Sequence, residues 1–306
     1  MSNQQQLIQI SAPTQDSQQF SPTSQIFTPT QESQLCTLTQ NEPEPLRIPE
    51  PVKTLCFFDT ETTGLTSSVL PPRIFQIAIH TLETRHFLRL EDVYRNNQHE
   101  NFVNYYKPRV YNSLELCFQP QAMIPPGVED ITLFNNELLE FQPKWTPDTE
   151  TQLNLFLNRL EKPIAVIGHN SIKHDFPILK SELQNADRDS NINFLAIDSL
   201  PILRQIFGDL NPSMAPHPPP LYHPWDRYVH EEPIQGQIGI NLTMPPSFSL
   251  PRLYNHIFNI NPPSSHQASQ DVWNLIKVCG AVGTKFVECL NKDETMFQDA
   301  IIKRIW

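Results

Sequence analysis

The chain has 306 residues, of which 39% are hydrophobic and 18% charged, enough to bury one sizeable core and carry additional segments. It has no run of about 18 apolar residues and its start, MSNQQQ, does not look like a signal peptide, which argues against membrane-spanning and secreted classes. We therefore expect a soluble protein of the cytoplasm, the nucleus or both.

The net charge of −11 argues against a polyanionic partner, because phosphate binding normally relies on Lys and Arg. Residues 1–52 carry five acidic side chains against one arginine, which leaves −7 for residues 53–306. If four of those carboxylates bind two divalent cations, the metal charges offset them and the domain is close to neutral. The acidity therefore weakens a nucleic-acid interpretation without excluding it.

Two zones have compositions that disfavour regular structure. Residues 1–52 are rich in Gln, Ser, Thr and Pro and have almost no apolar periodicity, so we expect a disordered tail. Residues from about 211 to 251 hold ten of the thirty prolines and are expected to form a surface insertion in the domain of residues 53–306. The PHPPP segment within it can form polyproline II, which predicts a partner of the proline-recognition kind.

The domain itself mixes strand and helix patterns. Four apolar segments are expected to be strands: TLCFFDTE, RIFQIAIHTL, NSLELCF and PIAVIGH. The segment DTETQLNLFLNRLE places four apolar residues on one stripe and is expected to be a helix. An α/β domain with a mixed central sheet flanked by helices follows.

The first strand ends in FFDTETTGL, which places Asp59 and Glu61 two residues apart. In a strand these side chains face the same side, where like charges raise each other's pKa. A hard cation such as Mg²⁺ would relieve that repulsion, and a pair of such ions needs more carboxylates than one strand supplies. The sequence therefore predicts further acidic ligands downstream.

A second candidate is Asp175 in GHNSIKHDFPILKSEL, where Pro177 suits the first turn of a helix with an apolar stripe. Taken alone, an Asp at such a position is more often a helix cap than a metal ligand. Both interpretations stay open on the local pattern.

A third candidate is Asp271 in PPSSHQASQDVWNLIKVCGAV, beside the apolar stripe of a helix for which Ser264 or Ser265 is the expected N-cap. An unpaired carboxylate at the edge of a buried stripe is costly, which favours a cation nearby. His266 is five residues earlier, about 140° around a continuous helix, so it should lie at or before the first turn. Taken alone, it would be an ordinary surface histidine.

Together these motifs resemble the DEDDh exonucleases, and within them the three-prime repair exonucleases. The resemblance rests on Asp-x-Glu at a strand end, H-N-x-x-x-x-Asp-F-P, and His-x-Ala-x-x-Asp, and it covers roughly residues 53–285. It implies an RNase H-like fold, two Mg²⁺ ions that Mn²⁺ can replace, a homodimer, and release of nucleoside 5′-monophosphates from DNA 3′ ends.

The resemblance also implies roles for individual residues. Four acids are implied as metal ligands: Asp59, Glu61, Asp175 and Asp271. His266 is implied as the general base, a task that its ordinary pKa of about 6.5 suits. Substrate contacts are implied for Thr62, Leu65, Ile131, Lys173 and His174. The family usually has Tyr where His174 stands, so the role of that contact is open. The proline-rich loop that the family commonly has between its second and third strands is replaced here by LEDVYRNNQHENFVNYYKPRVYN, so the resemblance implies no partner for such a loop.

Three functions remain to be weighed. The first is a metal-dependent 3′-5′ DNA exonuclease, and the second is the same fold acting on RNA, because tolerance of a 2′-hydroxyl cannot be inferred from these residues. The third is a non-catalytic protein that binds nucleic-acid ends or serves as a scaffold. The complete set of four acids and a histidine favours an enzyme.

Overall fold

The structure is a computed structural model that describes residues 50–66, 71–97, 102–186, 192, 194–212, 240–263 and 266–291. The predicted disorder of residues 1–49 and most of the proline-rich insertion lie outside these ranges. In the described part of the chain, no helix has the length and apolar character needed to cross a membrane.

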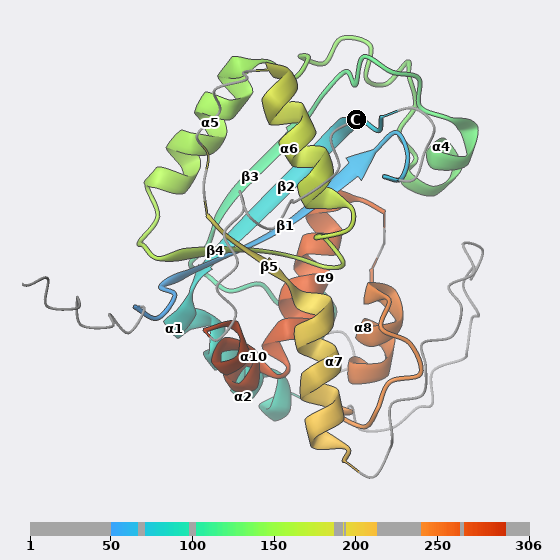
Figure 1. The fold of residues 1–306 in the computed structure, drawn as a ribbon. Coiled ribbons are helices and arrows are strands. Elements are labelled where there is room, and N and C mark those ends of the chain that lie inside the picture. Colours follow the sequence, from blue (N-terminus) through green and yellow to red (C-terminus); the bar gives the residue numbers. More distant parts are fainter. Residues whose placement is uncertain are drawn as a thin grey trace, which may run out of the picture. The chain divides into compact units, whose positions relative to one another are not determined.

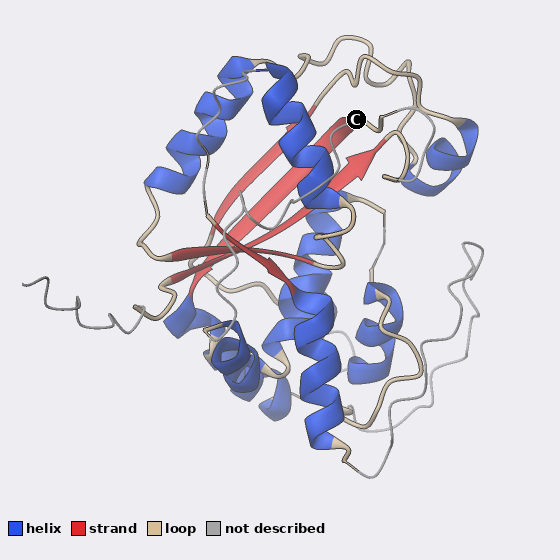
Figure 2. Cartoon of the chain, viewed as in Figure 1, coloured by secondary structure: helices blue, strands red, loops and turns tan. Residues whose placement is uncertain are grey.

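A five-stranded mixed sheet forms the centre of the described domain, in the order β3-β2-β1-β4-β5 (Figures 1 and 2). The strands are β1 (Thr54–Thr62), β2 (Ile74–Glu83), β3 (Asn112–Cys117), β4 (Ile164–Gly168) and β5 (Leu195–Asp198). β2 is antiparallel to β1 and β3, whereas β4 is parallel to β1 and β5. This order and direction are those of the RNase H-like fold, so the predicted fold class is confirmed.

Helices cover both faces of the sheet, so the side chains of β1 are buried on both sides. Phe58 and the other even-numbered apolar residues of β1 pack with α5 (Pro147–Asn158) and α6 (Asp175–Ala186). Phe57 and the odd-numbered residues pack into a larger core formed with the remaining long helices. These are α2 (Arg89–Asn96), α7 (Ser199–Leu210), α8 (Leu250–Phe258), α9 (Ala268–Gly280) and α10 (Gly283–Leu290).

Three short helices complete the described part of the domain: α1 (Thr84–Phe87), α3 (Phe102–Tyr105) and α4 (Pro126–Thr132). α4 matters for the site, because Val128 packs against Phe75 at the start of β2, which pairs with the end of β1. Figure 1 shows α4 beside the end of β1 accordingly.

The four predicted strands and the predicted helix at residues 148–161 are all present, with ends shifted by at most three residues. Two segments near the expected domain limits pack on the core. Val52 is buried, and its amide donates to Asn291 Oδ1 at 3.2 Å, so the packed domain begins before residue 53. In the described end of the expected insertion, Leu242 and Phe248 are partly buried and pack on the larger core.

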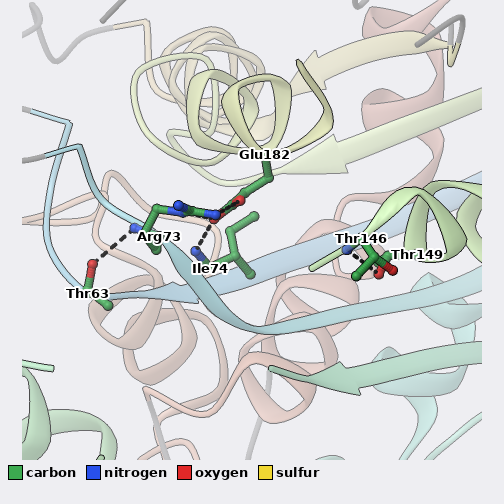
Figure 3. Close-up of polar contacts among 6 residues, drawn as sticks. All are labelled: Thr63, Arg73, Ile74, Thr146, Thr149 and Glu182. Atoms are coloured by element: carbon green, nitrogen blue, oxygen red, sulfur yellow. Dashed lines mark hydrogen bonds and ion pairs between the residues drawn. The ribbon is translucent and has the colours of Figure 1, made fainter. Parts of the chain in front are cut away.

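An ion pair between a buried Glu182 and a partly buried Arg73 joins α6 to the start of β2 (Figure 3). Arg73 donates from Nε and from a terminal nitrogen to the two carboxylate oxygens of Glu182, each at 2.8 Å, and the Ile74 amide donates to Glu182 Oε1 at 3.0 Å. The backbone of Arg73 is in turn held by Thr63, just beyond the end of β1. Figure 3 also shows the start of α5, where the Thr146 amide donates to Thr149 Oγ1 at 3.3 Å.

Candidate metal centre

Asp59 and Glu61 lie near the end of β1 on the face that packs against α9. Their partners across the antiparallel ladder are Ala78 and Gln76 of β2. Because alternate residues of a strand share a face, both carboxylates point toward the same layer of helices. The paired orientation expected from the sequence is present.

Asp271 reaches these carboxylates from the first turn of α9. Carboxylate oxygens of Asp59, Glu61 and Asp271 all lie within 4.8 Å of one another. Among the described residues, these three acids form a group that could hold a metal ion. Hard divalent cations take carboxylate oxygens as ligands, so the chemistry of the three residues fits Mg²⁺ or Mn²⁺.

Asp175 approaches the same strand end from the opposite layer. It is the first residue of α6, and Oδ1 accepts a hydrogen bond from Thr60 Oγ1 at 2.6 Å. Thr60 lies between Asp59 and Glu61 and points to the α6 face, which places Asp175 beside the tight group of three acids and outside it. Asp175 is buried, and its carboxylate binds Thr60 of β1. The side chain therefore contacts a second element of the fold and is more than a cap of α6.

The four carboxyl groups perturb one another. Burial, followed by the charges of Asp175, Glu61 and Asp271, raises the pKa of Asp59 well above its usual range. Burial and the charges of Asp271 and Asp175 raise the pKa of Glu61 to about 8. Burial also raises the pKa values of Asp175 and Asp271 to about 6. The raised pKa values show that, without a metal, the four carboxylates are not balanced by nearby positive charge. Binding a proton or a cation therefore stabilises the cluster.

His266 precedes α9, as the spacing predicts, but the cap differs from expectation. The N-cap of α9 is Gln267, not Ser264 or Ser265, which lie outside the described residues. His266 has φ 63°, a left-handed conformation in which histidine is enriched among non-glycine residues. This turn aims its amide at Asp271 Oδ2, 2.6 Å away. The residue is exposed, and partial burial of its imidazole lowers the pKa.

The loop that joins β4 to α6 is held by Asp198, a residue to which the sequence argument gave no role. Asp198 Oδ1 accepts from the Asn170 amide at 2.8 Å, and Oδ2 accepts from the Ile172 amide at 3.3 Å. Gly168 is required where this loop begins, because a Cβ there would lie 2.5 Å from Ser171 Cβ. The chain is thereby directed toward Asp175.

Lys173 and His174 lie at the end of the same loop. Thr66 Oγ1 donates to the Lys173 carbonyl at 3.0 Å and lies 3.4 Å from His174 Nδ1. Lys173 is exposed and His174 half-buried, and burial lowers the pKa of His174. The loop after β1 and the loop before α6 thus meet beside the acids.

The other predicted substrate contacts lie near the end of β1. Thr62 is the last residue of β1, and its hydroxyl donates to the Gly64 carbonyl at 2.7 Å. Leu65 and Ile131 leave 60% and 51% of their surface exposed, so both side chains are accessible to a ligand. Ile131 belongs to α4, beside the start of β2.

Sequence reasoning missed Thr60 and Asp198. Thr60 carries no signal of its own, because a threonine between two acids in a strand is an ordinary β residue. Asp198 had a signal, since it ends a short apolar run and precedes Ser-Leu-Pro, the pattern of an N-cap, and its carboxylate accepts from the Leu200 amide at 3.0 Å.

Comparisons with known proteins agree with the predicted resemblance. The chain is 28% identical to three prime repair exonuclease 2 of Mus musculus over 233 residues, covering 75% of this chain and 84% of the relative. It is 27% identical to three-prime repair exonuclease 1 of Homo sapiens over 234 residues, covering 76% of this chain and 64% of the relative. The similarity to three-prime repair exonucleases is therefore confirmed over three quarters of the chain. No family model matches the chain.

Among solved structures, the chain is similar to Escherichia coli exonuclease I in complex with a dA16 oligonucleotide. The TM-score is 0.49 at 15% identity, with 78% of this chain and 42% of the exonuclease I chain covered. The chain thus spans less than half of that protein. The RNase H-like fold class follows from the strand order of the sheet and not from the similarity to exonuclease I.

Proposed function

We propose that the protein is a metal-dependent 3′-5′ exodeoxyribonuclease that releases nucleoside 5′-monophosphates from DNA 3′ ends. The observation that carries the proposal is the convergence of Asp59, Glu61 and Asp271 within 4.8 Å, with Asp175 close enough to raise the pKa of two of them. Such a cluster is costly without a cation. The names of the similar proteins supply the reaction class.

In this proposal the four acids hold the metal ions. When bound, two Mg²⁺ or Mn²⁺ ions supply the charge neutralisation that lets a phosphodiester anion be attacked by water. Asp59, Glu61 and Asp271 hold ions from the face of α9, and Asp175 does so from the α6 side. Thr60 and the His266 amide orient Asp175 and Asp271, as outer hydrogen-bond partners of metal ligands commonly do.

His266 acts as the general base. It takes a proton from the attacking water, whose oxygen bonds to phosphorus while the bond from phosphorus to the 3′ oxygen of the preceding nucleotide breaks. Its exposed position before α9 and its lowered pKa keep the imidazole neutral near pH 7.

The terminal nucleotides bind beside the end of β1. Leu65 and Ile131 offer apolar surface to the bases. Thr62 contacts the 3′ end of the DNA, and Lys173 supplies positive charge near the scissile phosphate. His174 lies beside Lys173 and contacts the same phosphate region. We propose DNA over RNA because the similar proteins are named repair exonucleases.

The oligomer proposed here is a homodimer that pairs through β3. This strand is at one edge of the sheet, so its outer backbone groups are available to a second copy. Light scattering at micromolar concentration should give the dimer mass, and a monomer would refute this part of the proposal. A partner for the proline-rich segment stays a prediction, because that segment lies outside the described residues.

The substrate class is tested with matched 5′-labelled DNA and RNA oligonucleotides. With Mg²⁺ we expect the DNA to shorten stepwise at least tenfold faster than the RNA. Faster degradation of the RNA would favour the ribonuclease alternative. Binding of either oligonucleotide with no shortening in Mg²⁺ or Mn²⁺ would favour the non-catalytic alternative.

A further inference from the structure

A side chain of β2 binds the first amide of α9, in addition to the hydrogen bond that the His266 amide donates to Asp271 of the helix. The N-cap residue, Gln267, makes no side-chain hydrogen bond to the helix. The amide of Ala268, the first residue of the helix, donates instead to Gln76 Oε1 at 3.1 Å. Gln76 leaves 2% of its surface exposed, so this bond is made in a buried environment.

The orientation of the Gln76 amide group is fixed by Glu115. Gln76 Nε2 donates to Glu115 Oε1 at 3.2 Å, so the other end of the amide presents its oxygen to α9. A carboxylate can only accept at this position, and the Ala268 amide can only donate. The two neighbours therefore specify a residue with one donor and one acceptor.

Gln76 also faces the metal centre directly. It is the cross-strand partner of Glu61 in the antiparallel ladder. A neutral side chain in this position reaches α9 without adding another negative charge opposite Glu61. A glutamate would reach equally far and would repel both Glu61 and Glu115.

The next contact between β2 and α9 is made by His80, on the same face of β2. Its Nε2 lies 3.0 Å from Ser269 Oγ, and its ring stacks on Trp273 with centroids 4.7 Å apart. His80 secures the helix beyond its first residue. Loss of Gln76 should therefore free the start of α9 while the rest of the helix stays packed.

We infer that Gln76 is a positioning residue of the metal centre, which sets the start of α9 and so places Asp271 and the His266 turn opposite Asp59 and Glu61. This inference rests on the proposed metal site. Outer partners of metal-binding groups typically contribute 10-fold to 100-fold in metal affinity. Gln76 acts through the backbone of the helix, not by touching metal or substrate.

The test measures hydrogen exchange of a peptide covering residues 267–275, by mass spectrometry on the full-length, metal-free protein. Gln76→Leu keeps the volume and removes the acceptor, so we expect at least tenfold faster exchange at the start of α9. Ile77→Val serves as the control, because the neighbouring residue faces the α6 layer and its truncation lowers stability without touching α9.

Rescue separates a specific hydrogen-bond role from simple loss of packing. Gln76→Glu places two carboxylates against each other and should also loosen the start of α9 at pH 8. The exchanged pair Gln76→Glu with Glu115→Gln restores one donor facing one acceptor, and it leaves an oxygen for the Ala268 amide. We expect this double variant to exchange more slowly than Gln76→Glu and faster than the wild type, because the repulsion between residue 76 and Glu61 is still present.

Mn²⁺ titration by calorimetry then links the helix to the site, with an expected 10-fold to 100-fold weaker binding in Gln76→Leu. Unchanged exchange in Gln76→Leu, exchange in the double variant no slower than in Gln76→Glu, or loosening by Ile77→Val equal to that of Gln76→Leu would overturn the inference. Loosened exchange with unchanged Mn²⁺ affinity would overturn it as well. If the wild-type protein itself binds no Mn²⁺, the proposed function fails, and the exchange data still show whether Gln76 holds α9.

Discussion

The acids at the end of β1 set the chemistry of the protein at the scale of single residues. Burial raises the pKa values of Asp59, Glu61, Asp175 and Asp271, and repulsion by the neighbouring carboxylates raises those of Asp59 and Glu61 further, with Glu61 at about 8. In the unfolded chain such groups titrate near pH 4. Between about pH 4 and pH 8 the folded, metal-free protein therefore binds more protons than the unfolded chain, and its free energy of unfolding falls as pH rises.

Asp271→Asn should consequently stabilise the metal-free protein at pH 8, by roughly 2 kcal/mol, because it removes one of the repelling charges. Mg²⁺ should raise the melting temperature of the wild-type protein more at pH 8 than at pH 5.5, and this rise should be small in the variant. Thermal unfolding in EDTA and in Mg²⁺ measures both effects. Asp148→Asn is the control, because it removes the charge of an exposed acid on α5 outside the cluster. A variant less stable than wild type in EDTA at pH 8 would contradict the account.

His266 differs from the acids in its expected phenotype. His266→Ala should slow single-turnover cleavage by roughly 10²-fold to 10⁴-fold and leave Mn²⁺ affinity nearly unchanged, because it removes a base and no ligand. The wild-type rate should fall on the acid side of the usual histidine pKa of about 6.5, since that pKa is lowered here. Cleavage at the wild-type rate, or metal loss as severe as in Asp271→Asn, would refute the general-base role.

At the scale of elements, the site depends on how α6 and α9 are fastened to β2. Glu182 of α6 is buried, and it accepts three hydrogen bonds from Arg73 and Ile74. Glu182→Ala should lower the free energy of unfolding by about 3–5 kcal/mol, because it leaves a partly buried guanidinium and a buried amide without their partner. Urea unfolding measures this. Glu83→Ala removes the acceptor of an exposed pair with Arg85 and should change stability little.

The sequence predicted the strands of the sheet because their apolar runs are long and bounded, and it placed the three acidic motifs at the ends of the right elements. β5 was not predicted as a strand, since four residues carry too little periodicity. The cap of α9 was mispredicted for a physical reason: the group that satisfies its first amide comes from Gln76, 192 positions away. Tertiary hydrogen bonds of this kind leave no local pattern.

At the scale of the whole molecule, the limits of the folded domain can be tested by truncation. Val52 is 4% exposed, its amide donates to Asn291, and its carbonyl accepts from Thr84 Oγ1 at 2.8 Å. A chain that begins at Glu50 should match the full-length protein in melting temperature and nuclease activity. A chain that begins at Lys53 should lose about 2–3 kcal/mol of stability, mainly through the lost burial of Val52.

Equal melting temperatures for the two truncated chains would show that Val52 contributes nothing to the core. Loss of cleavage in the chain that begins at Glu50, with an unchanged circular dichroism spectrum, would show that residues 1–49 belong to the active enzyme.

The central claim is that one cluster of carboxylates gives the whole molecule a metal-dependent, 3′-directed DNA nuclease activity. The most direct measurement is the product ladder of a 5′-labelled DNA strand under single-turnover conditions, for wild type and Asp59→Asn, in EDTA and in Mg²⁺. The account predicts a ladder that shortens one nucleotide at a time from the 3′ end only with wild type and Mg²⁺. A ladder in EDTA, a ladder of similar rate with Asp59→Asn, or intact DNA with wild type in Mg²⁺ would contradict it.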